Sequence, residues 1–233
     1  MTNPLLPTRF LFRFSAPCRY RDPLWTDEGP QLDETFRLIG LAELEEQAAP
    51  ADVRAAWSEA GLAFAVRVQG KRQPPWCRES RPEDSDSFQV WIDTRDVHNV
   101  HRAGRFCHRF VFLPTGGGGK GGQAPFAGKK KGACPPFSPA MAEWLPINRA
   151  REQPHPIPAG LLKARCRHCA DGYLLEALIP AEALTGFDPA EHPRLGFAYA
   201  IVDRELGQQT FGVGSPMPYQ EDPSLWATLE LVR

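Results

Sequence analysis

The stretch ADVRAAWSEAGLAFAVRV, residues 51–68, decides the fold class of this chain. Its first half places the apolar residues Val53, Ala55 and Trp57 at every second position. A second alternating run follows a turn at residues 58–61. A period of two sends successive side chains to opposite faces of a strand, whereas an amphipathic helix repeats every three to four residues. The stretch therefore predicts a β-hairpin.

Similar patterns extend along most of the chain. Strands are predicted for seven further segments, at residues 10–14, 87–94, 109–113, 161–169, 172–179, 195–203 and 225–232. Residues 38–46 fit either a strand end or a short helix, and Pro180 begins a helical turn. The 24 prolines and 20 glycines favour many short strands joined by turns. We therefore predict an all-β fold: a single antiparallel β-sandwich, with jelly-roll or immunoglobulin-like layers and short helical turns.

Length and composition predict one domain. The chain has 233 residues, of which 42% are hydrophobic, and this is enough to bury a sizeable core. We found no internal repeat and no dividing linker, so residues 1–233 are expected to form a single unit. Residues 114–132, PTGGGGKGGQAPFAGKKKG, are expected to be a flexible insertion, because glycine and lysine cannot form a core. A phosphate-binding loop would need Ser or Thr after Lys120, where this chain has Gly121.

Charge and hydropathy limit the partners. The net charge of −1 gives no general attraction to nucleic acid or to an anionic membrane, so neither is expected as a partner. No apolar run approaches the ~20 residues of a membrane span. Prolines and arginines interrupt the N-terminal segment, which lacks the apolar centre of a signal peptide. We therefore expect a cytoplasmic protein whose six cysteines are mostly reduced. The sequence does not identify a protein partner.

One stretch gathers side chains that can bind metal or transfer protons. Residues 86–110, DSFQVWIDTRDVHNVHRAGRFCHRF, place four such side chains within eleven positions: His98, His101, Cys107 and His108. Cys166 and Cys169 could supply two more ligands to a tetrahedral zinc. However, they lie three positions apart in a strand pattern, which directs their side chains to opposite faces. We therefore predict no metal site and no cofactor, with zinc kept as an alternative.

Signatures of an enzyme are weak. The chain contains no G-x-S-x-G or H-E-x-x-H motif. Asp86 and Asp93 could act as a carboxylate pair in glycoside hydrolysis, but they flank a strand that reads as scaffold. We therefore predict no catalytic residues. A metal-dependent glycoside hydrolase remains an alternative, as does a structural or protein-interaction module without a sugar ligand.

Five segments, taken in order, resemble a known family. They are WSEAGLAFAVRV, DSFQVWIDTR, DGYLLEALIPAEAL, RLGFAYAIVDRE and DPSLWATLELV. Their order and spacing are similar to those of the family 9 carbohydrate-binding modules, which belong to the wider group of DOMON-like β-sandwiches. The resemblance covers the chain from about Val53 to the C-terminus. It implies non-catalytic carbohydrate binding through an aromatic clamp at one end of a β-sandwich, with a mono- or oligosaccharide as partner.

The resemblance also implies particular site residues. The two rings of the clamp would be Trp76, in PPWCRES, and Tyr219, in PYQEDPS, where the family usually has tryptophan. Gln89 takes the place of a strand carboxylate that binds the sugar, and His108 or Arg109 follows on the next strand. A sugar's C–H face stacks on an aromatic ring, while amides and guanidinium groups bind its hydroxyls. The alternative for Trp76 is a ring that anchors its loop to the edge of the sandwich.

The remaining tryptophans fit structural roles. Trp57 and Trp226 lie in strand patterns and are expected in the core. Trp91 has the opposite parity to Phe88, Val90 and Ile92, so we expect it on the other face of its strand under a loop.

Overall fold

The computed structural model describes residues 14–39, 49–116, 135–215 and 217–233. Three predictions fall largely outside these ranges. They concern the strand at residues 10–14, the segment at residues 38–46 and the Gly/Lys-rich insertion at residues 114–132. No helix in the described part of the chain is long and apolar enough to cross a membrane.

The fold is all-β, as the sequence predicts. Helical structure in the described residues is limited to single 3-10 turns: η2 (Glu34–Phe36), η4 (Pro82–Asp84), η5 (Ala181–Ala183) and η6 (Pro223–Leu225). The strands are β1 (Ser15–Tyr20), β2 (Ala51–Ser58), β3 (Gly61–Gln69), β4 (Ser87–Asp93), β5 (Cys107–Leu113), β6 (Ser138–Pro139), β7 (Met141–Trp144), β8 (Lys163–Cys169), β9 (Gly172–Pro180), β10 (Arg194–Asp203), β11 (Gly207–Thr210) and β12 (Ala227–Val232).

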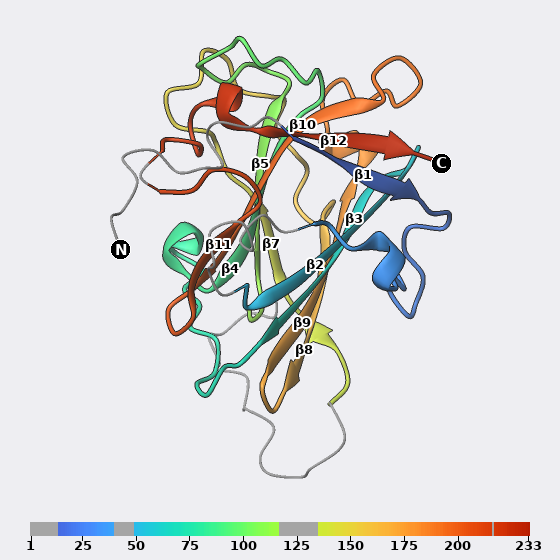
Figure 1. Ribbon diagram of the computed structural model, residues 1–233. Coiled ribbons are helices and arrows are strands. Elements are labelled where there is room, and N and C mark those ends of the chain that lie inside the picture. The colour runs from blue at the N-terminus through green and yellow to red at the C-terminus, as the bar shows by residue number, and fades with distance from the viewer. Residues whose placement is uncertain (1–13, 40–48, 117–134, 216) are drawn as a thin grey trace.

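The strands form one hydrogen-bonded path that folds into two layers (Figure 1). The path runs β6-β8-β9-β3-β2-β1-β12-β10-β4-β5-β7, and β11 pairs with β10. The pairs are antiparallel except for those of β1, which lies parallel to both β2 and β12 and joins the layers. β6 and β7 are the two ends of this path, one in each layer. Only Ala140 separates them in sequence, so the chain crosses there from one layer to the other. This path is that of a β-sandwich.

The core fills the space between the two layers. The hairpin β2–β3 has the predicted parity, because Phe64 and Val66 point inward while Ala63 and Ala65 line the outer face. The ring of Phe64 lies 5.4 Å from that of Phe88 on β4 and 6.2 Å from that of Phe197 on β10. These contacts join opposite layers and fix which residues of each strand are left on the outer faces.

Candidate functional site

The candidate sugar site lies on the outer face of β4 and β5. Phe88, Val90 and Ile92 of β4 belong to the core, so Gln89 and Trp91 point outward. Arg109 of β5 pairs directly with Trp91 and therefore also points outward. The sheet register thus places two predicted site residues, Gln89 and Arg109, on one face.

These two residues are in direct contact. Arg109 Nη2 donates a 2.9 Å hydrogen bond to Gln89 Oε1. The amide Nε2 of Gln89 donates to the Glu83 carbonyl at 3.1 Å and to Ser87 Oγ at 3.2 Å. Arg109 Nε is buried and has no hydrogen-bond partner among the described residues. Burial lowers the pKa of Arg109, and the charge of Glu83 opposes that shift. A donor that stays unpaired in this way costs about 1–3 kcal/mol.

Tyr219 covers the same face from the segment between β11 and η6. Its ring stands edge-on to Trp91, with 5.4 Å between the ring centroids, and is only 3% exposed. Its hydroxyl accepts a 2.7 Å hydrogen bond from Gln208 Nε2, and its carbonyl accepts one of 2.7 Å from Trp226 Nε1. Trp91 therefore lies on the outer face under a loop, as predicted, and Trp226 is buried, as is Trp57.

Trp76 lies half-buried in the loop between β3 and β4. Its backbone N–H donates to Asp86 Oδ2 at 3.0 Å, and its carbonyl accepts from Asp86 N at 2.9 Å. The guanidinium carbons of Arg204 and Arg78 lie 4.2 Å and 4.9 Å from its ring. The backbone of Trp76 is thus fixed to the start of β4, while its ring contacts two cations.

A buried ion-pair triad holds this loop. Lys71 Nζ lies 3.1 Å from Asp86 Oδ2 and 2.5 Å from Asp203 Oδ2, and all three side chains are almost fully buried. Asp86 Oδ1 also accepts from Arg204 N at 2.8 Å. The triad therefore links the Trp76 loop to the end of β10.

His108 lies on the other face of β5 from Arg109, which corrects its assignment to the site. It pairs with the core residue Ile92 and is fully buried. Its ring stacks on that of Phe110, with 6.0 Å between the ring centroids. The reason is strand parity: Phe110 and Phe112 fix the inward face of β5, and His108 shares it.

His98, Cys107 and Cys166 lie in separate parts of the fold. His98 contacts Asp96 at 3.0 Å and Thr228 at 3.1 Å, while Cys107 is buried beside Trp91 in a small apolar cluster. Cys166 lies in the main core, and burial raises its thiol pKa well above the usual value. In the described part of the chain, no three His, Cys, Asp or Glu side chains are grouped so that they could hold a metal ion.

Asp86 and Asp93 do not form the pair that glycoside hydrolysis needs. Asp86 and Asp93 sit at opposite ends of β4, about 23 Å apart at ~3.3 Å per residue, whereas glycosidase carboxylates lie roughly 5–9.5 Å apart. Asp86 is bound in the triad, and Asp93 accepts hydrogen bonds from the backbone of Arg95 and Val97 at 3.0 and 2.8 Å. Both carboxylates therefore have structural roles.

A serine, a histidine and an aspartate also meet at η6. Ser224 Oγ and Asp222 Oδ2 lie 3.0 Å and 3.1 Å from the same atom, His101 Nδ1. A catalytic triad uses both ring nitrogens, one for the nucleophile and one for the carboxylate. This arrangement is therefore a capped turn, in which Asp222 also accepts from Ser224 N at 2.9 Å.

Several neighbours of the site were not predicted from the sequence. Glu143 of β7 pairs with Val111 on the outer face, and burial together with the charge of Glu83 raises its pKa. Arg204, in the β10–β11 turn, and Gln208, on β11, contact the two predicted rings. Only Arg78, two residues after Trp76, lay close enough in sequence to be suspected.

Comparison with known proteins identifies the fold. No protein-family model matches the chain, and no curated protein matches it. A family 9 carbohydrate-binding module from Caldicellulosiruptor kristjanssonii, solved in complex with cellotriose, matches with a TM-score of 0.57 and 11% identity over 94% of each chain. A structure of such a module from the same organism with glucose matches with a TM-score of 0.56 and 11% identity, over 94% of this chain and 95% of that one. The chain has the fold of a family 9 carbohydrate-binding module.

Proposed function

We propose that this protein is a non-catalytic carbohydrate-binding module, with its site on the outer face of β4 and β5. The observation that carries the proposal is Arg109, which is half-buried beside Gln89 with its Nε unpaired. Because this Nε is buried, the guanidinium must turn before a sugar hydroxyl or ring oxygen can accept the missing hydrogen bond. Arginine and a side-chain amide together supply the donors and acceptors that a polyhydroxylated ligand needs.

The two aromatic rings support the same location. The Trp76 ring lies against Arg204, and the Tyr219 hydroxyl is bound by Gln208, so both rings contact the β10–β11 hairpin. Gln89 pairs with Ala200 on that hairpin. A sugar that stacks on Trp76 displaces an arginine from the ring, and one that stacks on Tyr219 moves the ring away from Trp91. Breaking one contact between an arginine and an aromatic ring costs ~0.5–1 kcal/mol at an exposed position.

The first ligands to test are glucose and cellotriose. The two matching structures of family 9 modules were solved with these sugars. The carboxylates considered above have structural roles in the described residues, so binding without hydrolysis is the expected activity. An incubation of cellotriose with the protein should leave the trisaccharide intact.

Replacing Arg109 with leucine should weaken cellotriose binding about 10- to 100-fold. A hydrogen bond to a charged group contributes about 1.5–3 kcal/mol, and the variant removes the guanidinium while keeping an apolar side chain at this position. Isothermal titration calorimetry measures the effect. Arg105→Leu is the matched control, because Arg105 is exposed and stacks on Phe106 away from Gln89. Equal dissociation constants for wild type and Arg109→Leu would remove Arg109 from the site.

A further inference from the structure

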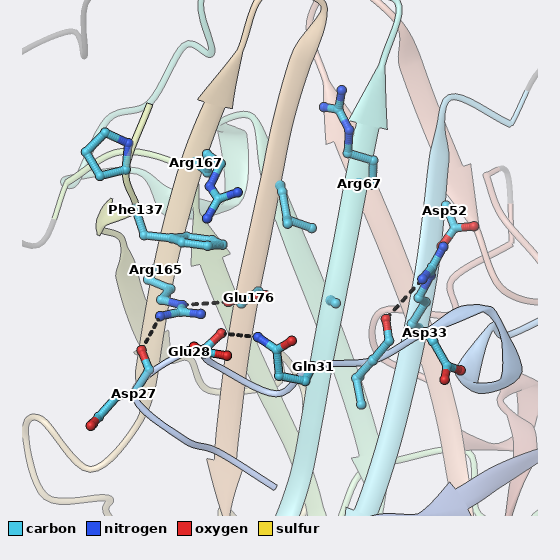
Figure 2. Close-up of a pocket in the computed structure, with 15 residues that line it drawn as sticks. Asp27, Glu28, Gln31, Asp33, Asp52, Arg67, Phe137, Arg165, Arg167 and Glu176 are labelled. Atoms are coloured by element: carbon cyan, nitrogen blue, oxygen red, sulfur yellow. Dashed lines mark hydrogen bonds and ion pairs between the residues drawn. The ribbon is translucent and has the colours of Figure 1, made fainter. Parts of the chain in front are cut away.

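A separate groove lies on the outer face of the other layer, over β2, β3, β9 and β8 (Figure 2). Its volume is about 890 Å³, which is within the usual range for a small-molecule site. The loop around Gln31 and Asp33 forms one wall, and Phe137 forms the opposite wall. Its residues are distinct from those proposed for the sugar site.

Sheet register arranges the floor in two transverse rows. Arg67, Leu174 and Arg167 are direct neighbours across β3, β9 and β8. The next row contains Ala65, Glu176 and Arg165 on the same strands, with Arg54 beside Ala65. Directly opposite side chains on paired strands lie about 4.5–5.5 Å apart, so the rows form a continuous surface. This surface carries small apolar side chains between charged ones.

Three of the four arginines that line the groove already have anionic partners. Their guanidinium groups lie 2.5–2.7 Å from carboxylates: Arg54 from Asp52, Arg67 from Asp171 and Arg165 from Glu176. Arg165 also donates to the Asp27 carbonyl at 2.8 Å. These ion pairs stabilise the floor and the loop around Gln31 and Asp33. Because each of the three arginines is already paired, little of their positive charge is left to attract a ligand.

Arg167 differs from the other three. No carboxylate lies within ion-pair distance of it among the described residues, and its Nε is buried without a hydrogen-bond partner. Its guanidinium carbon lies 4.2 Å from the ring centroid of Phe137, and that of Arg165 lies 4.0 Å from the same centroid. Figure 2 shows the Phe137 ring between the two arginines. Arg167 is thus held in place at the groove without an ion-pair contact, although its charge favours the ionised form of Glu176 across the floor.

The wall across the groove from Arg167 is acidic. Asp33 lines it, and hydrogen bonds from Thr35 lower the pKa of its carboxyl, which is therefore ionised at neutral pH. The amide of Gln31 lies along the same loop, whereas Glu28 lies at the other end of that loop, beside Arg165 (Figure 2). A ligand that spans the groove must bring negative charge to Arg167 and hydrogen-bond donors to this wall. A second negative charge there would be repelled.

We propose that this groove is a second binding site, which accepts a sugar with one carboxylate, of the uronic acid type. The carboxylate pairs with Arg167, the ring lies over Ala65 and Leu174, and the hydroxyls donate to the acidic wall. Guanidinium groups bind carboxylates with two parallel hydrogen bonds. Because the Nε of Arg167 is buried, the carboxylate would pair with the two terminal nitrogens. The site does not depend on the first one, because it uses other strands on the other layer.

Titration with sodium glucuronate, monitored by NMR chemical shifts, tests the second site. Wild type should bind glucuronate, and Arg167→Gln should weaken binding at least tenfold. Arg109→Leu, which alters the first site, should leave glucuronate binding unchanged. Arg151→Gln is the matched control, because Arg151 is exposed and lies outside the groove. Equal melting temperatures of Arg167→Gln and wild type would establish that the variant is folded.

Other results would overturn the proposal. It is wrong if wild type does not bind glucuronate, or if Arg167→Gln binds it as tightly as wild type. Loss of glucuronate binding in Arg109→Leu would assign the acidic sugar to the first site instead. If glucose shifts the resonances of Ala65 and Leu174 with the same affinity as glucuronate, the groove does not select a carboxylate. Failure of cellotriose to bind, with glucuronate binding intact, would count only against the first site.

Discussion

Replacing Lys71 with methionine is expected to lower the free energy of unfolding by about 3–5 kcal/mol. The variant leaves the side chains of Asp86 and Asp203, both 0% exposed, without the cation that lies 3.1 Å and 2.5 Å from them. Removing one partner of a buried ion pair is costly because the remaining charge is neither solvated nor neutralised. For a chain of this size the melting temperature should fall by roughly 6–20 °C.

Chemical denaturation of wild type and Lys71→Met measures this difference. Lys163→Met is the matched control, since Lys163 is an exposed residue of β8, and it should change stability by less than about 0.5 kcal/mol. Burial lowers the pKa of Lys71, but the hydrogen bond to Asp203 and the charges of both aspartates raise it above its usual value. The Lys71 contribution should therefore persist up to about pH 10.4 and be lost as the pH rises through the raised pKa. A stable Lys71→Met variant would show that the triad is not essential to the Trp76 loop.

Acid should destabilise the protein through His108. Burial lowers the pKa of this histidine from 6.5 to about 4, and the Thr185 backbone opposes part of the shift. Between these values the unfolded chain binds a proton that the folded protein does not, so stability falls as the pH decreases. The loss from this one group is about 3 kcal/mol over that range.

The variant His108→Leu isolates this effect. Because leucine does not titrate, the variant should lose less stability than wild type between pH 6.5 and pH 4, whatever its stability at neutral pH. His155→Leu is the matched control, because it makes the same replacement at an exposed histidine. Parallel stability curves for wild type and His108→Leu would mean that the pKa of His108 is the same in the folded protein as in the unfolded chain, which contradicts the lowered value.

The strands that the sequence predicts are those in which the buried residues are mainly apolar ones. The hairpin β2–β3 alternates in sequence, and its two faces pack into different apolar clusters, so its period alone identified it. β1 was missed because Pro17 interrupts SAPCRY, although Ala16 and Cys18 point into the core. β11 was missed because GQQT is polar. Gln209 is buried there because its amide pairs with both the N–H and the carbonyl of Ala51 at 3.0 Å, a contact invisible in local sequence.

The site was only partly predictable for a related reason. Gln89 and Arg109 lie on adjacent strands whose parity follows from Phe88 and Phe110, and the same parity could have assigned His108 to the interior. The loop residues depend on distant contacts instead. The position of Trp76 follows from Lys71 and Asp203, which are 132 residues apart. Such contacts cannot be inferred from local periodicity.

The most direct test of the proposed function is a calorimetric titration of wild type and Trp76→Ala with cellotriose. Ring stacking on a sugar contributes about 1 kcal/mol or more, so Trp76→Ala should bind at least fivefold more weakly than wild type. Its melting temperature should change little, since the ring is half-exposed and its loop is held through the backbone. Trp25→Ala is the control, because Trp25 stacks on Arg165 in the other layer. No heat of binding with wild type, or a Trp76→Ala variant that loses stability but keeps its affinity, would contradict carbohydrate binding at this site.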